Sequence, residues 1–170
     1  MASLLALMVA SPAWAQSGMS PNSAASGTRS AHTTQDVRFV MAASAAGDTE
    51  IMASRLAQKQ AQSANVKTFA ATMIHDHTMA NEQLKAIAQK DGYSIASMPT
   101  ETQEANLAKL RPLHGADFDK AYATMMVSDH RDAVALFQSE SNSGNNADLK
   151  AFATQTLPIL QHHLSMATSL

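Results

Sequence analysis

The sequence predicts an all-α protein, an antiparallel four-helix bundle with one additional short helix. Four long segments carry apolar residues at every third or fourth position, which is the spacing of a helix face. Val, Ile and Thr do not gather in the alternating runs that are typical of strands, whereas Ala and Met are plentiful. The connections between paired long segments are short, so we expect successive helices to lie antiparallel.

Length and composition limit the domain count and the classes of partner. A chain of 170 residues with 45% hydrophobic content supports one compact core, and we expect a single domain at residues 34–170. The net charge is −2 and no basic cluster is present, which argues against nucleic acid as a partner. The chain has no Cys, so disulfides and thiol chemistry are excluded.

The first residues predict export. An apolar stretch at residues 4–10 precedes Ala13-Trp14-Ala15, a small-x-small cleavage sequence, so we predict a signal peptide at residues 1–15. The stretch is too short to span a bilayer, and no Lys or Arg precedes it. Residues 16–33 are rich in Ser, Gly and Asn, which predicts a flexible leader. A soluble periplasmic or secreted product is therefore expected.

The first long helix is predicted to begin at Thr33 or Thr34, which are suitable N-caps, and to run to about residue 62. Small side chains dominate its apolar face, so a neighbouring helix can approach closely. That face carries Phe39, Ala43, Ala46, Glu50, Ala53 and Ala57.

The second long helix is predicted from Val66 to about residue 90, where Asp91-Gly92 ends it. The connection before it is short, so these two helices should form an antiparallel hairpin. Its apolar stripe carries Val66, Phe69, Met73, His77, Ala80, Leu84 and Ile87.

A shorter amphipathic helix follows. Thr100 and Gln103 form a capping box that opens it, and His114-Gly115 breaks it near residue 113. We expect this helix to cover one end of the bundle.

The last two long helices should form a second hairpin. One runs from about residue 117 to 141, residues 144–146 make the turn, and Pro158 is expected to kink the final helix. The first of the two presents Phe118, Tyr122, Met126, His130, Ala133 and Phe137, and the second presents Leu149, Phe152, Thr156, Ile159, His163 and Met166 or Ala167.

A weak internal repeat supports the pairing into two hairpins. The sequence VKTFA at residues 66–70 resembles LKAFA at residues 149–153, and both open the second helix of a predicted hairpin. A duplicated helical hairpin is the unit from which ferritin-like bundles are built. We therefore predict a ferritin-like arrangement.

Four polar side chains stand on stripes that otherwise face the core, one on each long helix: Glu50, His77, His130 and His163. A buried imidazole or carboxylate costs free energy unless a hydrogen bond, an opposite charge or a metal compensates it. Three neutral imidazoles and one carboxylate suit a single Zn, Cu or Fe ion. We therefore predict these four residues as metal ligands.

Axial position tests this prediction. Glu50 and His77 lie at similar distances from their shared loop, so they should meet at one height. His163 lies about five residues farther from its loop than His130, which at about 1.5 Å per residue is a mismatch of roughly 7 Å. A kink at Pro158 would absorb part of that difference.

Two neighbouring acids add a further expectation. Asp76-His77 and Asp129-His130 repeat one pattern, so each Asp either orients the ring beside it or is a solvated acid. His75 is two positions from His77 and should lie on the surface.

A structural alternative to the metal site is a buried hydrogen-bonded network. The hydroxyl groups of Tyr122, Thr72 and Thr156 are available as partners for the imidazoles. Methionines at helical spacing are interpreted as core filler rather than as Cu(I) ligands.

The order and spacing of these motifs resemble the exported bacterial domain-of-unknown-function 4142 family, described as ferritin-like. The resemblance covers about residues 34–170, implies a helical bundle in the bacterial envelope, and brings no established reaction. The motifs are Phe39-Val40 with Glu50-Ile51, Phe69-Ala70 with Asp76-His77-Thr78, Phe118-Asp119-x-x-Tyr122 with His130, and Leu157-Pro158-x-Leu160-x-x-His163-Leu164.

Catalytic chemistry finds little support in the sequence. Di-iron bundles use Glu-x-x-His pairs, but Ile74 and Leu160 stand three positions before His77 and His163. No nucleophile triad or Gly-rich phosphate loop is evident. We expect a metal-binding or redox-protective envelope protein. The alternative is a non-catalytic interaction or stress-response module that contacts an envelope protein partner and keeps the His/Glu network as structure.

Overall fold

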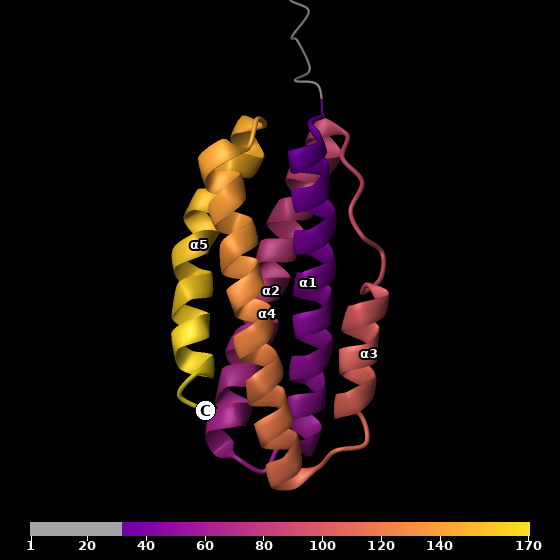
Figure 1. The fold of residues 1–170 in the computed structure, drawn as a ribbon, viewed down its shortest axis with the longest axis vertical. Helices are drawn as coiled ribbons and strands as arrows, with labels where there is room; N and C mark the ends of the chain where they lie inside the picture. Colours follow the sequence, from indigo (N-terminus) through magenta and orange to yellow (C-terminus); the bar gives the residue numbers. More distant parts are fainter. Residues whose placement is uncertain (1–31) are drawn as a thin grey trace, which may run out of the picture.

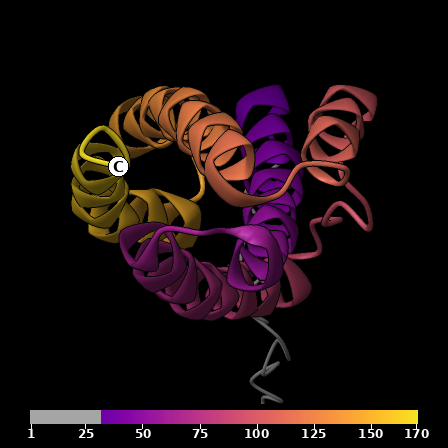
Figure 2. The ribbon, with the colours of Figure 1, turned by 90° about the horizontal axis from the view of Figure 1, so that it is seen from below.

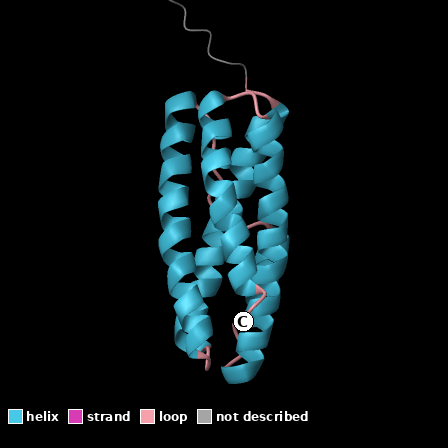
Figure 3. Cartoon of the chain, turned by 90° about the vertical axis from the view of Figure 1, so that its left-hand side faces the viewer, coloured by secondary structure: helices cyan, strands magenta, loops and turns pink. Residues whose placement is uncertain are grey.

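The computed structural model of the protein describes residues 32–170. The predicted signal peptide, residues 1–15, and most of the predicted leader, residues 16–33, lie outside the described residues. Residues 32–170 form five α-helices and no strand (Figures 1 and 3), which confirms the all-α prediction. The helices are α1 (Thr34–Gln60), α2 (Ala64–Asp91), α3 (Glu101–Leu110), α4 (Gly115–Ser143) and α5 (Ala147–Ala167).

The four long helices form an antiparallel bundle built from two hairpins, α1–α2 and α4–α5. Viewed along the bundle, they follow one another around the ring in the order α1, α2, α5, α4 (Figure 2). The helices pack most closely within each hairpin. The hairpins meet along α1–α4 and along α2–α5, and the α2–α5 seam is the more loosely packed of the two.

Local capping explains why the predicted helix ends lie within a few residues of the observed ones. The capping box of Thr100 and Gln103 is formed in full at the start of α3. Gly92 ends α2 in the left-handed region, at φ +82°, which a residue with a side chain rarely adopts. The N-caps whose side chains accept backbone hydrogen bonds are Thr33, Ser63, Thr100 and Asn146.

The short helix α3 lies along the side of the bundle against α1 and α4 (Figure 1), so the expectation that it covers an end was wrong. The segment before it runs beside α1, where the Ala96 amide donates to the Ser44 hydroxyl at 2.9 Å. Leu107 and Leu110 are buried in the core on this side. Burial of these two leucines gives α3 a stable position along the helices rather than across their ends.

The core consists of two apolar clusters. One lies toward the α1–α2 loop and the other toward the α4–α5 loop. The first cluster includes Ala53, Ala57, Val66, Phe69, Met73, Phe118, Tyr122 and Met126. The second includes Phe39, Val40, Leu84, Phe137, Leu149, Phe152 and Leu160.

The inner face of α5 differs from the prediction by one position. Ile159 is 46% exposed, whereas Leu160 is 3% exposed and packs in the core. Leu160 lies four residues after Thr156 and three before His163, so it continues the helical stripe that Ile159 leaves. The helix continues through Pro158, which lies on the exposed side.

Small residues of α1 permit the close α1–α2 approach that the sequence predicts. A Cβ atom at Gly47 would lie 2.2 Å from the side-chain oxygen of Asn81, so a larger residue would displace that side chain. Asn81 itself donates to the Asp48 carboxylate at 2.8 Å.

A buried pair of carboxyl groups lies at the end of the bundle near the α4–α5 loop. Asp36 is 0% exposed and accepts from the Asn145 amide at 2.9 Å, and Glu140 is 1% exposed. Burial, together with the charge of Asp36, raises the pKa of Glu140 from its ordinary value of 4.5 to about 7. Burial also works to raise the pKa of Asp36, but hydrogen bonds, chiefly from Asn145, bring it below its ordinary value.

Glu140→Gln is expected to stabilise the protein near pH 8 and to change little near pH 5. Folding raises the pKa of this carboxyl, so its protonated form stabilises the fold in full below the unfolded pKa of 4.5. That contribution to the free energy of unfolding is lost as the pH rises through about 7. Gln cannot ionise, so the variant avoids the loss of about 3 kcal/mol in free energy of unfolding that the protein with Glu140 undergoes over this pH range. Denaturant unfolding at about pH 5 and about pH 8 measures the difference. The same pH dependence in both proteins would contradict the assignment.

Candidate metal centre

A polar layer separates the two apolar clusters of the core. It consists of Glu50 on α1, His77 on α2, His130 on α4 and His163 on α5, which are 1%, 6%, 0% and 1% exposed. The structure therefore brings together all four residues that the sequence singles out. That they bind a metal stays a prediction.

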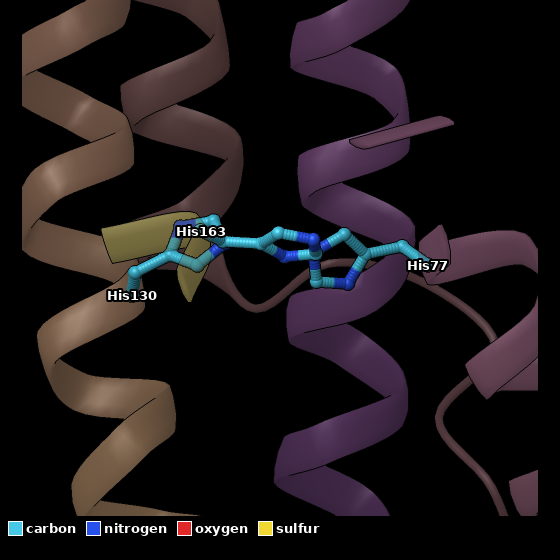
Figure 4. Close-up of side chains that lie close together, drawn as sticks. All are labelled: His77, His130 and His163. Carbon is cyan, nitrogen blue, oxygen red and sulfur yellow. The ribbon is translucent and has the colours of Figure 1, made fainter. Parts of the chain in front are cut away.

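The three imidazoles face one another, and the carboxylate of Glu50 lies beside two of them. Each of the three histidines offers a ring nitrogen, and these nitrogens all lie within 4.8 Å of one another. Figure 4 shows the three rings, from three different helices, turned toward a common point. The carboxylate of Glu50 lies 2.9 Å from Nε2 of His77 and 3.5 Å from Nδ1 of His130.

The expected mismatch in height between His130 and His163 is smaller than the sequence suggests. Helix α4 ends at Ser143 and helix α5 begins at Ala147. Counted from these two ends, Val127 of α4 is level with His163, and His130 lies three positions nearer the loop, an offset of about 4.5 Å. Helical side chains lean toward the N-terminus of their helix, so in antiparallel α4 and α5 these two rings lean toward each other. The lean closes most of the remaining distance.

Hydrogen bonds fix which nitrogen of two rings carries the proton. Nδ1 of His130 lies 2.9 Å from the Met126 carbonyl, which can only accept, so Nδ1 donates and Nε2 keeps its lone pair. Nε2 of His163 lies 2.9 Å from the Asp76 carboxylate, so Nε2 donates and Nδ1 keeps its lone pair. Both rings are therefore neutral imidazoles, each with a free lone pair that could bind a metal ion.

The inward-facing atoms have no hydrogen-bond partner among residues 32–170. Nε2 of His77 lies 2.9 Å from the Glu50 carboxylate, to which it is attracted by charge. A buried polar atom without a partner costs about 1–3 kcal/mol, so a species that binds several of them at once would stabilise the fold. The unpartnered atoms of the layer are Oε1 of Glu50, Nε2 of His77, Nε2 of His130 and Nδ1 of His163.

Burial and mutual charge divide the layer into one ion pair and two neutral rings. Burial lowers the pKa of His130 and brings the pKa of His163 down to about 4, so both rings are neutral at neutral pH. Burial also works to raise the pKa of Glu50 and to lower that of His77. The attraction between these two groups outweighs it, so the pKa of Glu50 falls and that of His77 rises.

Comparison with known proteins identifies the family. The profile of the family described as a domain of unknown function (DUF4142) matches residues 20–170. The chain belongs to the DUF4142 family. The resemblance drawn from the motifs is thereby confirmed. No curated protein matches the chain.

Two solved structures share the fold of this DUF4142 chain. A DUF305 fragment from Deinococcus radiodurans matches with a TM-score of 0.71 and 16% identity over 81% of this chain and 95% of that chain. A DUF305 protein from Streptomyces coelicolor matches with a TM-score of 0.66 and 14% identity over 78% and 88%. At such low identity the likeness concerns the fold alone.

In this DUF4142 chain, neither Asp76 nor Asp129 bonds to the cluster histidine that follows it. Asp76 bonds to His163 on another helix instead of to His77, and Asp129 makes no hydrogen bond to His130. Adjacent residues of a helix point about 100° apart. When a histidine faces the core, the acid before it therefore points toward the side of the helix. Asp129 lines a cleft beside α3, where burial above all raises its pKa to about 7.

Two of the three hydroxyl groups that the structural alternative offered as partners are engaged elsewhere. The Tyr122 hydroxyl pairs with Ser54 at 2.8 Å, and the Thr72 hydroxyl donates to the Thr68 carbonyl. Thr156 is buried but makes no side-chain hydrogen bond to an imidazole within residues 32–170. The network alternative therefore lacks the partners that the sequence suggested for it.

A double-mutant cycle on Glu50→Gln and His77→Gln, made with metal-free protein, tests the buried ion pair. Each single change should lower the free energy of unfolding by about 3–5 kcal/mol, because it leaves one buried group uncompensated. The double variant should lose less than the sum, with a coupling of about 1–3 kcal/mol. Chemical denaturation measures all four proteins, and His162→Ala, an exposed position, is the control. Strict additivity would contradict the pairing.

Proposed function

We propose that Glu50, His77, His130 and His163 bind one divalent transition-metal ion of the Zn, Cu or Fe class. The observation that carries the proposal is the convergence of one ring nitrogen from each of three buried histidines, whose rings each keep a nitrogen without a hydrogen-bond partner in the described part of the chain. In a tetrahedral site with metal–nitrogen bonds near 2.0 Å, ligand nitrogens are about 3.3 Å apart. Ring movements of about 1 Å would bring the present nitrogens to that spacing.

The donor set supports holding an ion rather than catalysis. Three imidazoles and one carboxylate fill a tetrahedral coordination sphere, so no position stays open for water or a substrate. The apolar clusters on both sides of the layer also exclude solvent. Binding would replace the Glu50–His77 ion pair, so the proton held by His77 is released when an ion binds.

Several observations support a location in the bacterial envelope. The sequence predicts a signal peptide at residues 1–15, and the Streptomyces coelicolor DUF305 protein of the same fold has been proposed to be secreted. None of the helices in residues 32–170 combines the length and apolar composition that crossing a bilayer requires. We propose an exported protein of the periplasm or the outer-membrane surface.

The rival function is an interaction or stress-response module in which the polar layer is purely structural. The Glu50–His77 ion pair and the His163–Asp76 hydrogen bond favour it, because they already offset part of the burial cost. This function differs from metal binding in a measurable way, because it requires no metal and places function on the helix surfaces.

Metal-free protein, purified without a His tag, is expected to take up about one equivalent of Zn(II) or Co(II). His77→Ala/His130→Ala should abolish uptake, because it removes two of the three imidazoles. His114→Ala/His162→Ala removes two imidazoles that lie outside the centre and should leave uptake unchanged. Elemental analysis and a calorimetric titration measure the stoichiometry. Protein that contains no transition metal and takes up none on titration would refute the proposal.

Asp76→Asn is expected to weaken metal binding about 10–100-fold without changing the stoichiometry. The amide is a poorer acceptor for the N–H of His163, so that ring loses both its fixed orientation and part of its basicity. Asp129→Asn is the matched control, because Asp129 also precedes a cluster histidine but contacts no ring. Competition with a chelator of known affinity measures both variants. Equal weakening of metal binding in both variants would show that the loss of a nearby negative charge, and not the loss of the hydrogen bond to His163, lowers the affinity.

A further inference from the structure

We propose that a cleft between α2 and α5 is the path by which the metal ion reaches and leaves the buried centre, with His75 and Asp76 as transfer ligands on its wall. This inference rests on the proposed function. It concerns how the ion travels rather than whether it binds.

The apolar clusters and the close packing within each hairpin disfavour other approaches to the centre within residues 32–170. The two apolar clusters close the centre along the bundle axis, and a charged ion pays a large desolvation cost in such surroundings. The helices of each hairpin pack closely, and α3 lies along α1 and α4 beside their seam. The α2–α5 seam carries no such cover in the described part of the chain and is the more loosely packed junction between the hairpins.

A cleft of about 440 Å³ opens along this seam and reaches the centre. His163 lines the cleft and also belongs to the centre, so the two spaces share one wall. The clefts beside α3 and between α1 and α2 contain none of the four cluster residues. The side chains that line the α2–α5 cleft include His75, Asp76, Met79, Ile159, Leu160 and His163.

Three ligating side chains lead inward along the cleft wall. His75 is 75% exposed, and its Nδ1 lies 2.8 Å from one oxygen of Asp76. The other oxygen of Asp76, whose side chain is 32% exposed, lies 2.9 Å from Nε2 of His163, which is 2% exposed. Imidazole and carboxylate bind the same class of divalent ion as the centre. An ion can thus exchange its water for protein ligands in steps instead of losing all of it at once.

A path that serves both directions leaves a kinetic signature. Narrowing it slows uptake and release by the same factor, so the dissociation constant stays unchanged. A change in the centre itself alters the dissociation constant instead. Rates and affinity together therefore separate the path from the binding site.

The test follows Co(II) uptake by metal-free full-length protein in a stopped-flow instrument, and Co(II) removal by excess chelator. Ile159→Trp places a large side chain in the cleft from a position that is 46% exposed, and it should slow both rates about tenfold. The control is Met52→Trp. Met52 is 42% exposed and lines a cleft of about 420 Å³ between α1 and α2, so both rates should stay unchanged.

His75→Ala is a second variant that cannot fail through misfolding, because the side chain is mostly exposed. It should slow uptake and release severalfold at unchanged affinity. Wild-type rates in both Ile159→Trp and His75→Ala would overturn the proposed path, as would slowing by Met52→Trp instead. Those results would leave the metal site intact, whereas wild-type protein that binds no Co(II) would refute the proposed function and this inference with it.

Discussion

The burial of one carboxylate and three imidazoles between two apolar clusters is the constraint on which the rest of the structure depends. Each long helix contributes one ionisable side chain to this layer at a buried position, which costs free energy that an apolar residue would not. Partial compensation comes from the ion pair of Glu50 and His77 and from the outward hydrogen bonds of His130 and His163. Several nitrogen and oxygen atoms of the layer still lack a hydrogen-bond partner within the described part of the chain, and this is the cost that the proposed metal ion would offset.

In both hairpins, the two polar side chains of the layer are offset along the bundle by the same number of residues. Counted from the ends of α1 and α2 at their shared loop, Gly47 is level with His77, and Glu50 lies three positions nearer the loop. His130 and His163 show the same offset across the α4–α5 loop. In both pairs the residue on the second helix is therefore the one farther from the loop. Because side chains of antiparallel helices lean toward each other, an offset of about 4.5 Å brings the two ends together.

The sequence predicts the helices and the polar layer because both depend on local rules. Thr100 with Gln103, and Gly92, mark helix ends through their own capping geometry, and a polar residue on an apolar stripe is visible without a neighbour. The sequence does not predict that α3 lies along the bundle or that Asp76 reaches His163. Periodicity gives the angle of a residue about its own helix, but not which element lies on that side. The choice of Ile159 over Leu160 was wrong for a related reason, because positions three and four after Thr156 both lie near one helix face and periodicity does not decide between them.

Asp76 lies between the buried polar layer and the solvent-accessible cleft. Glu50 and His130 are enclosed on every side, so in the proposed centre they would bind the ion without contact to solvent. Asp76 holds a ligand of the centre and also lines the cleft that opens to solvent, so one side chain links the orientation of His163 to the accessible wall. In the proposed metal centre, which is closed on three sides and reached through one polar wall, exchange of the ion would be slow. The four proposed donors would also leave no open coordination position, which turnover of a substrate requires.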